Sequence, residues 1–532
     1  MLVKEINYKE TSCFSPLFCD YINNEPKLKS FYNQYPSIDN FKNQIDQKKR
    51  NYKNQNREII YKVIKEQYKG VNCSKDFKLI LESIKNKNTF TITTGHQLNL
   101  FTGPIYFLYK IITTINLCEE LSHKYPKFNF IPVYWMATED HDFKEINHFN
   151  FKNTKIEWES NQTGVVGEFL TAELKTVLDE LKRIFPNNKN SNELIDLFKN
   201  TYLKDNCLSD ATRNFVHMLF RKYNLLIIDA NHKNLKNCFK DFLKKEVKDS
   251  FIKKSSLPTI NKLAKLNYKV QAHTRDVNLF YINNNQRQRI LKNNNHLLIE
   301  GNKNKLDQKN IIKRIENNPE KFSPNVLFRT MYQEYLLPNL CYIGGPAEVS
   351  YWLQLKKSFE MLKLTFPILL NRNSVLLISS RQMKKLKKLN IEIEDIFLDL
   401  NELTTKKTKE FSELDIDFSE LKNVLKDQFK YLFDIASQTD HSFTGAVKAQ
   451  EKKQLDGIIH LEKRLLSAQK KKFSDHLSRI IELKKELFPF ETLQERRINF
   501  SEFYCEYGYN IIERLKKNIN PLNMSFSVIV ID

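Results

Sequence analysis

The stretch that most constrains the fold is residues 91–142, where two apolar runs flank a glycine-containing loop and a helical segment. Residues 90–93 are β-branched and aromatic, which is typical of a strand. Residues 105–121 repeat apolar side chains at helical spacing, and residues 130–136 form a nearly continuous apolar run. Such a run suits a parallel strand whose sheet is covered on both faces. The stretch therefore predicts a strand, a loop, a helix and a second strand, parallel to the first.

Polar side chains directly follow both predicted strands. The first loop carries a glycine, an imidazole and an amide, and the second carries three carboxylates and an imidazole. These residues are Gly95, His96 and Gln97 in the first loop, and Glu139, Asp140, His141 and Asp142 in the second. In open α/β sheets, ligands bind outside the carboxyl ends of the strands. We therefore expect the two loops to meet at one site.

The first loop suits a nucleotide or a carboxylate, because it can present backbone N–H groups and an imidazole. The sequence contains neither a Walker A pattern nor GxGxxG, which disfavours a P-loop or dinucleotide fold. A loop histidine that caps the next helix is the alternative for His96. Lys110, on that helix, is expected at the surface. The residues predicted to bind the cofactor here are Gly95, His96, Gln97, Thr102 and Gly103.

The acidic loop has two functional interpretations, metal ligation or general acid–base chemistry with binding of a substrate amine. A solvated acidic loop is the third. Four ionisable groups at the end of an apolar strand are costly to place unless something binds them, which favours function. We assign catalysis to Glu139, Asp140, His141 and Asp142. No cysteine lies near them in the sequence, so no structural zinc is expected, and we name no metal ligand.

A third informative region spans residues 323–355. It predicts an amphipathic helix over residues 326–337, a strand over residues 340–343 and a helix that begins near Ala347. The Gly-Gly-Pro loop before that helix could hold a phosphate or carboxylate, or it is only a tight turn. The region adds Gly344 and Gly345 as cofactor-binding residues, and Arg329, Gln333, Glu348 and Trp352 as substrate-binding residues. An i,i+4 surface pair is the alternative for Arg329 and Gln333, and core packing is the alternative for Trp352.

The 532 residues allow several domains. We expect a catalytic α/β core over residues 1–379, with helices at residues 1–87 and insertions at about 159–205 and 231–320. Residues 446–487 form one long charged helical pattern with an apolar seam that slips after Ala468, which predicts a coiled-coil hairpin within residues 380–490. Residues 491–532 are expected to form a helix and a closing strand.

Composition narrows the class of protein. The formal charge is +22, but the basic residues are spread along the chain beside many Asn and Ile residues, and no nucleic-acid motif accompanies them, so we expect a solvated basic surface. The eight cysteines form no CxxC pair, which favours reduced thiols. There is no signal-peptide h-region and no apolar run of transmembrane length. A cytoplasmic protein without a membrane or nucleic-acid partner is expected.

The motifs resemble those of a known family. They are GHQLNLFTGPIY, PVYWMATEDHDFKEINH, SPNVLFRTMYQEYLLPNLCYIGGPAEVSYWLQL and LQERRINF, in this order along the chain. Together they resemble the BshC family, the cysteine ligases of bacillithiol biosynthesis. The resemblance implies a Rossmann-like core of the nucleotidyl-transferase type with connecting-peptide insertions, followed by a helical coiled-coil domain. The family pattern usually has Gln at the position of His96, so a role there does not carry over directly.

The resemblance also implies a reaction, in which the carboxyl group of cysteine is joined to the glucosamine amine of glucosaminyl-malate. Because an amide does not form from a free carboxylate in water, we expect ATP, with Mg²⁺, to activate cysteine as an adenylate or an acyl phosphate. Two other functions stay open: a non-catalytic nucleotide-binding scaffold for thiol biosynthesis, and an RNA-binding transferase-like protein. The coiled coil could pair within one chain or form a homodimer.

Overall fold

A computed structural model describes residues 1–293, 296–301 and 307–531. The chain divides into two units. The first unit contains residues 1–9, 13–377 and 494–531, and the second contains residues 10–12 and 378–493. The segment after residue 493 therefore returns to the first unit, where it meets the loop that follows the first core strand.

The first unit is built on a five-stranded sheet with the order β12-β11-β2-β3-β6. Its strands are β2 (Thr89–His96), β3 (Asn129–Met136), β6 (Leu226–Asp229), β11 (Asn339–Gly344) and β12 (Ile368–Asn371). All four neighbouring pairs are parallel. Along the chain the sheet grows from β2 through β3 and β6 on one side, and then through β11 and β12 on the other. The order of strands thus reverses between β2 and β11, and a crevice for ligands is expected there.

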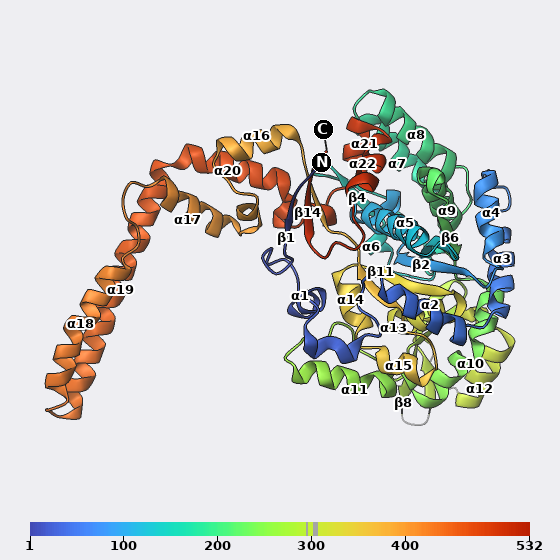
Figure 1. Ribbon diagram of the computed structural model, residues 1–532, viewed down its shortest axis with the longest axis horizontal. Coiled ribbons are helices and arrows are strands. Elements are labelled where there is room, and N and C mark those ends of the chain that lie inside the picture. Colours follow the sequence, from blue (N-terminus) through green and yellow to red (C-terminus); the bar gives the residue numbers. More distant parts are fainter. Residues whose placement is uncertain (294–295, 302–306, 532) are drawn as a thin grey trace. The chain divides into compact units, whose positions relative to one another are not determined.

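Helices cover both faces of this sheet (Figure 1). On one face, α5 (Tyr106–Lys124) packs against the sheet, in a buried cluster that also contains residues of α2 (Asn40–Asn51) and of four strands. The cluster includes Phe41, Ile45, Phe90, Ile92, Leu117, Leu121, Phe130, Leu340, Ile343, Ile368 and Leu370. On the other face, Tyr332 of α13 (Val326–Leu336) lies edge-on against Trp135, with ring centroids 5.5 Å apart. Phe130 and Trp135 point to opposite faces because side chains alternate along a strand.

The amino terminus differs from the helical prediction. Residues Leu2–Ile6 form strand β1, which pairs antiparallel with β14 (Phe526–Val530), and β14 also adjoins β13 (Val375–Ile378). The partner of β1 lies more than 500 residues away in the sequence, so no local pattern indicates the pairing. The other elements before β2 are helical, namely α1 (Pro16–Ile22), α2, α3 (Gln55–Gln67), α4 (Lys75–Ser83) and the 3-10 turn Pro26–Phe31.

The segments between the core strands carry the insertions. The first holds α6 (Phe143–Ile146), the hairpin of β4 (His148–Phe151) and β5 (Thr154–Glu157), and then α7 (Lys175–Ile184), α8 (Lys189–Tyr202) and α9 (Leu208–Leu219). The second holds α10 (Lys233–Asp249), α11 (Phe251–Lys265), the strands β7 (Leu279–Asn283), β8 (Gln286–Asn293) and β9 (His296–Ile299), and α12 (Gln308–Asn317). Strand β10 (Phe322–Pro324) joins the edge of β7. Helices α14 (Pro346–Trp352), α15 (Lys356–Met361), α21 (Ser501–Tyr507) and α22 (Asn510–Asn518) complete the unit.

The second unit is helical. It contains α16 (Ser380–Lys388), α17 (Leu400–Phe411), α18 (Ser419–Ala436), α19 (His441–Lys472) and α20 (Ser474–Leu487). Helices α18 and α19 pair through buried Phe429, Ala436 and Val447. The slip in the apolar seam corresponds to the break at Phe473, where α19 ends and α20 begins. Within the described ranges, no helix is both long and apolar enough to cross a membrane.

Candidate functional site

A cavity of about 630 Å³ lies at the carboxyl ends of β2 and β11. This is the point where the strand order reverses, and pockets of this size commonly bind small molecules. Its walls come from the loops after β2, β3 and β11, from α13 and α14, and from the returning segment after residue 493. Of the residues predicted from the sequence, Gly95, His96, Gln97, Asp140, Arg329, Gln333, Gly345, Glu348 and Trp352 line it.

Lys110 joins the carboxyl end of β2 to the first turn of α14 at the edge of this cavity. Its Nζ donates to Gly95 O at 2.7 Å and lies 2.5 Å from Glu348 Oε2. Glu348 in turn accepts from Gly345 N at 2.6 Å and from the Tyr342 hydroxyl at 2.8 Å. The expectation that Lys110 lies at the surface is wrong, because only 3% of the residue is exposed. The end of β2 and the beginning of α14 are thus fixed to each other by one buried cation.

The prediction that Gly95 and His96 lie in a loop is wrong, because both belong to β2, which ends at His96. The His96 ring contacts the rings of Tyr106 and Phe107. Burial, together with nearby Lys110 and Arg372, holds the pKa of His96 well below its ordinary value. The imidazole is therefore neutral at pH 7. Its Nε2 is buried and has no hydrogen-bond partner among the described residues.

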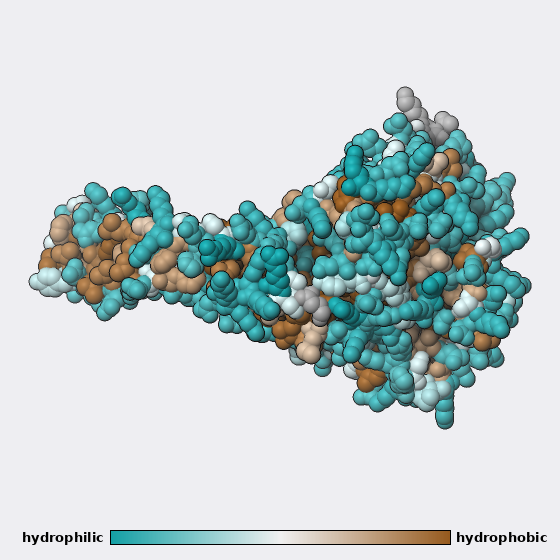
Figure 2. All heavy atoms as spheres, turned by 90° about the horizontal axis from the view of Figure 1, so that it is seen from above, coloured by the Kyte–Doolittle hydropathy of each residue, from teal (hydrophilic) through white to brown (hydrophobic). Residues whose placement is uncertain are grey.

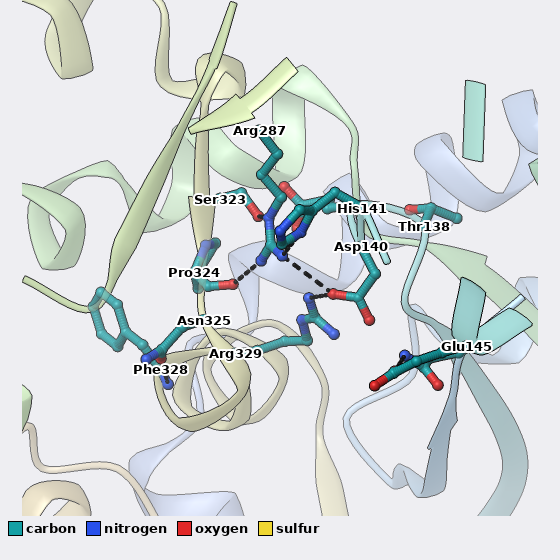
Figure 3. A network of polar contacts seen from close by, with 12 residues as sticks. Thr138, Asp140, His141, Glu145, Arg287, Ser323, Pro324, Asn325, Phe328 and Arg329 are labelled. Atoms are coloured by element: carbon teal, nitrogen blue, oxygen red, sulfur yellow. Dashed lines mark hydrogen bonds and ion pairs between the residues drawn. The ribbon is translucent and has the colours of Figure 1, made fainter. Parts of the chain in front are cut away.

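Asp140 is held between two arginines (Figure 3). Arg329 Nη2 donates to its Oδ1 at 2.8 Å, and Arg287 Nη1 lies 3.3 Å from the same oxygen. Burial favours a higher pKa for Asp140, but Arg329 and Arg287 outweigh it and hold the pKa below its ordinary value. Both arginine contacts use Oδ1, and a side-chain hydrogen bond from Gln97 also favours the ionised form and lowers the pKa. Asp140 is therefore a stable carboxylate on the cavity wall.

Arg287 brings the second insertion to the site, and nothing in the sequence singled it out. It lies on β8, 8% exposed, and its guanidinium also donates to Ser323 Oγ and Pro324 O at 3.0 and 3.1 Å. The guanidinium carbon is 3.9 Å from the centroid of the Phe280 ring. Burial and the neighbouring Arg329 lower the pKa of Arg287 to about 10. The group is fixed in place by β7, β10 and Asp140 together.

The other three members of the acidic loop do not line the cavity. Glu139 is buried and forms an ion pair with Lys236, whose Nζ also donates to Phe322 O at 2.7 Å. His141 lies beside Arg287, with Nδ1 3.2 Å from Arg287 Nη1. Asp142 is exposed. Within the described part of the chain, no three His, Cys, Asp or Glu residues are grouped to hold a metal ion.

Gln333 is oriented by a buried network behind it. Its Nε2 donates to Glu334 Oε1 at 3.1 Å, and the same carboxylate accepts from Asn339 and from Lys48, both buried. Lys48 and Glu334 side chains are 3% and 0% exposed. Burial raises the pKa of Glu334 even though Lys48 is adjacent. With its amide nitrogen engaged, Gln333 has its carbonyl oxygen left for a ligand.

Thr102, Gly103 and Gly344 shape the loops without lining the cavity. Thr102 and Gly103 have positive φ angles of 68° and 67°. A Cβ on Gly103 would lie 2.7 Å from the Asn99 side chain, so only glycine fits there. Gly344 O accepts from Arg372 N at 2.8 Å. Thr102, Gly103 and Gly344 therefore set the backbone conformation that positions the residues facing the cavity.

Arg372 and Arg496 are site residues that the sequence prediction missed. Arg372 follows β12, is 2% exposed and makes two hydrogen bonds, at 2.9 and 2.7 Å, to the carboxylate of Glu495. Its guanidinium carbon lies 4.8 Å from the Tyr106 ring centroid. Arg496 lines the cavity beside it. The signal that could have found Glu495 and Arg496 is the segment LQERRINF, which contains both.

Three buried polar groups on the cavity wall lack partners among the described residues: His96 Nε2, Trp352 Nε1 and Arg372 Nε. The indole and guanidinium nitrogens can only donate hydrogen bonds. Buried donors without partners are costly unless a ligand supplies an acceptor. Together with Arg329, Arg496 and the aromatic side chains of Trp135, Tyr342 and Tyr351, they suit a ligand that is rich in oxygen and carries an aromatic ring, as a nucleotide does.

The family models match both parts of the chain. Residues 1–373 match "Bacillithiol biosynthesis BshC, N-terminal Rossmann-like domain", and residues 375–531 match "Bacillithiol biosynthesis BshC, C-terminal coiled-coil domain". The chain belongs to the BshC family. This confirms the resemblance drawn from the motifs, and it confirms the predicted Rossmann-like α/β core followed by a coiled-coil domain. The BshC carboxyl-terminal domain includes the returning segment, residues 494–531, that completes the site.

Curated relatives align with this chain from end to end. Three examples, each with the description "Putative cysteine ligase BshC", show this. The relative from Flavobacterium johnsoniae is 47% identical over 526 residues, covering 99% of both chains. The one from Flavobacterium psychrophilum is 48% identical over 525 residues, and the one from Christiangramia forsetii is 44% identical over 529 residues; each alignment covers 98% of both chains.

Proposed function

We propose that this chain is an amide-forming ligase of bacillithiol biosynthesis that joins the carboxyl group of cysteine to the amine of glucosaminyl-malate, with ATP as the source of activation. The observation that carries the proposal is the alignment of the whole chain, at 44–48% identity, with relatives described as cysteine ligases. The cavity at the switch point of the sheet, with its donors that lack partners, supports it.

The chemistry requires activation because a carboxylate resists attack by an amine. An oxygen of the cysteine carboxylate attacks a phosphorus atom of ATP, releasing pyrophosphate from the α-phosphorus or ADP from the γ-phosphorus. The amine nitrogen then attacks the carboxyl carbon, the C–N bond forms, and AMP or phosphate leaves with that oxygen. Arg329, Arg372 and the donors around them would stabilise the charge on the phosphates, as preorganised donors do for developing anions. Mg²⁺ would bind with the nucleotide.

Asp140 would hold the ammonium group of cysteine. Arg287 and Arg329 keep the carboxylate ionised, so an ammonium can bind it without a change in protonation. The cysteine carboxylate would then point toward Gln97 and the phosphate groups. This gives Asp140 a binding role, whereas the acidic loop as a whole was predicted to be catalytic.

The experiment is to incubate purified protein with cysteine, glucosaminyl-malate and Mg-ATP, and to analyse the mixture by mass spectrometry. We expect the condensed thiol together with AMP, for an adenylate, or ADP, for an acyl phosphate. Binding of ATP without turnover, with both substrates verified, would instead favour the non-catalytic scaffold. Steeply salt-dependent RNA binding would favour the transferase-like alternative.

We also propose that the coiled-coil helices pair with a second copy of this chain. Large apolar side chains on α18 and α19 are exposed, among them Leu421, Val424, Tyr431, Leu432, Ile435, Phe443, Ile459 and Leu461. Figure 2 shows hydrophobic residues gathered along these helices. Exposed patches of this kind are typical of interaction surfaces. Light scattering should give the mass of a dimer, and Tyr431→Glu with Leu432→Glu should give that of a monomer; a monomeric wild type would contradict this pairing.

None of the eight cysteines, all of which lie in the described part of the chain, forms a disulfide bond. This suits a reducing compartment such as the cytoplasm, where we place the protein.

A further inference from the structure

A second cavity, of about 260 Å³, adjoins the main one. Four residues line both cavities: Gln97, Pro104, Tyr106 and Arg496. The rest of its wall comes from Asn99 after β2, Glu145 of α6, the residues His148, Phe149 and Asn150 of β4, and Arg497. None of the functional assignments above uses these remaining residues.

The two cavities differ in chemistry. The main cavity has the aromatic side chains of Trp135, Tyr342, Tyr351 and Trp352 on its wall. The smaller one is lined mainly by a carboxylate, three amides, an imidazole and two guanidinium groups. Aromatic walls suit a flat base, whereas amides and charged groups suit a ligand with many hydroxyl and ionic groups. The smaller cavity therefore fits a sugar-like ligand better than a nucleotide base.

The smaller cavity holds opposite charges that are not paired with each other. Among the described residues, no carboxylate forms an ion pair with Arg496 and no cation forms one with Glu145, whose Oε2 accepts a hydrogen bond from Gln97 at 2.8 Å. Asn99 is 7% exposed, and no donor in the described part of the chain reaches its buried Oδ1. A ligand that carries both an ammonium and a carboxylate group would satisfy the two charges at once.

We propose that the smaller cavity is the subsite for the acceptor, an amino sugar that carries carboxylates, with its ammonium at Glu145 and a carboxylate at Arg496. This inference rests on the proposed ligase function, which supplies glucosaminyl-malate as such an acceptor. Asn99, His148 and Asn150 would meet the hydroxyl groups. Cysteine and ATP stay in the main cavity.

Gln97 lies where the two substrates must meet. It lines both cavities and donates to Glu145. The amine of the acceptor, bound at Glu145, would thus lie close to the boundary between the two cavities. On the other side of that boundary, Asp140 would hold the ammonium of cysteine. The amine attacks only after losing a proton, which Glu145 is placed to accept. Binding of the substrate ammonium would explain why the Glu145 carboxylate faces this cavity without an ion pair to a described residue.

The test measures binding of glucosaminyl-malate by calorimetry, without ATP, to the wild-type protein, Glu145→Gln and Arg496→Gln. Both residues are exposed, so folding should be preserved. The control is Glu159→Gln, an exposed carboxylate on the same segment that lines neither cavity. We expect each site variant to weaken binding about tenfold or more, the effect of losing one hydrogen bond to a charged group. Glu159→Gln should bind glucosaminyl-malate as tightly as the wild-type protein does, and Glu145→Gln should leave the affinity for ATP unchanged.

Two analogues assign each contact. Glucosyl-malate has a hydroxyl in place of the amine, and methyl glucosaminide lacks the carboxylates. The wild-type protein should prefer glucosaminyl-malate over glucosyl-malate, and Glu145→Gln should lose that preference. Arg496→Gln should weaken binding of glucosaminyl-malate but not of methyl glucosaminide. Each comparison forms a double-mutant cycle that isolates a single contact.

The outcomes separate this inference from the proposed function. If the wild-type protein binds glucosaminyl-malate and both variants bind it equally well, the subsite is refuted and the ligase function stands. If the variants raise the KM for cysteine and leave that for the acceptor unchanged, the two substrates have been assigned to the wrong cavities. If the wild-type protein does not bind the acceptor at all, the proposed function falls, and the subsite with it.

Discussion

Replacing Asp140 by asparagine is the perturbation whose effect follows most directly from the structure. The change removes the negative charge between Arg287 and Arg329, whose side chains are 4% and 15% exposed. Removing one partner of a buried ion pair lowers the free energy of unfolding by about 3–5 kcal/mol, because the remaining charge stays buried and unpaired. The Asp140 side chain is itself 20% exposed, so solvent screens part of the effect. We expect the free energy of unfolding of the first unit to fall by about 2–3 kcal/mol.

The measurement is urea denaturation followed by tryptophan fluorescence. All three tryptophans lie in the first unit, so the signal reports that unit alone. Asp142→Asn is the matched stability control, because it removes an exposed carboxylate two residues away in the same loop. Its cost should stay within about 0.5 kcal/mol.

The pH dependence gives an independent check on Asp140. The folded-state pKa of this carboxyl is lowered, so its stabilising contribution is present above the unfolded-state value of about 3.9 and is lost as the pH falls further. The difference between the wild-type protein and Asp140→Asn should therefore be constant from pH 8 to about pH 5 and shrink at lower pH. Equal stabilities of the two proteins at pH 7, or full ligation activity of Asp140→Asn, would refute the role given to this residue.

Three further perturbations test other parts of the structure. His96 is neutral in the folded protein, so its contribution to the free energy of unfolding is present above about pH 6.5 and is lost at lower pH by up to about 1.4 kcal/mol per pH unit. In urea titrations at pH 5–8, His96→Gln should lack that part of the dependence of stability on pH. The same pH dependence in the variant and the wild-type protein would contradict this role of His96. Arg372→Met should lower the free energy of unfolding by about 3–5 kcal/mol because Glu495 is left buried and unpaired. Adding Glu495→Gln to this variant should recover part of the lost stability. No recovery would show that the broken ion pair does not cause the loss. Lys236→Met should have a similar cost through Glu139 in the same assay, and an unchanged midpoint would contradict the buried pair.

The core of the site could be predicted because its signals are local. The run of residues from β2 through α5 to β3 shows strand and helix periodicities without interruption, and the Gly-Gly-Pro loop marks the end of β11. The rule that ligands bind at the carboxyl ends of strands then places both loops at one site. The coiled coil was predictable for the same reason, since its seam repeats over many turns.

The missed features depend on contacts between distant residues. Strand β1 needs β14 as its partner, and Lys110 is buried where the end of β2 meets the beginning of α14. Arg287 reaches Asp140 from an insertion 147 residues later in the chain. In the acidic loop, the sequence shows four similar side chains, and only the tertiary structure separates Asp140, which faces the cavity, from Glu139, which pairs with Lys236.

The most direct test of the central claim, that this cavity activates the carboxylate of cysteine for ligation, is an isotope-transfer measurement. Cysteine labelled with ¹⁸O in its carboxyl group is incubated with glucosaminyl-malate, Mg-ATP and the protein, and the products are analysed by mass spectrometry. We predict that the amide product forms and that one ¹⁸O atom appears in AMP or in inorganic phosphate. Amide product without label in either, or no product with both substrates verified, would contradict the account.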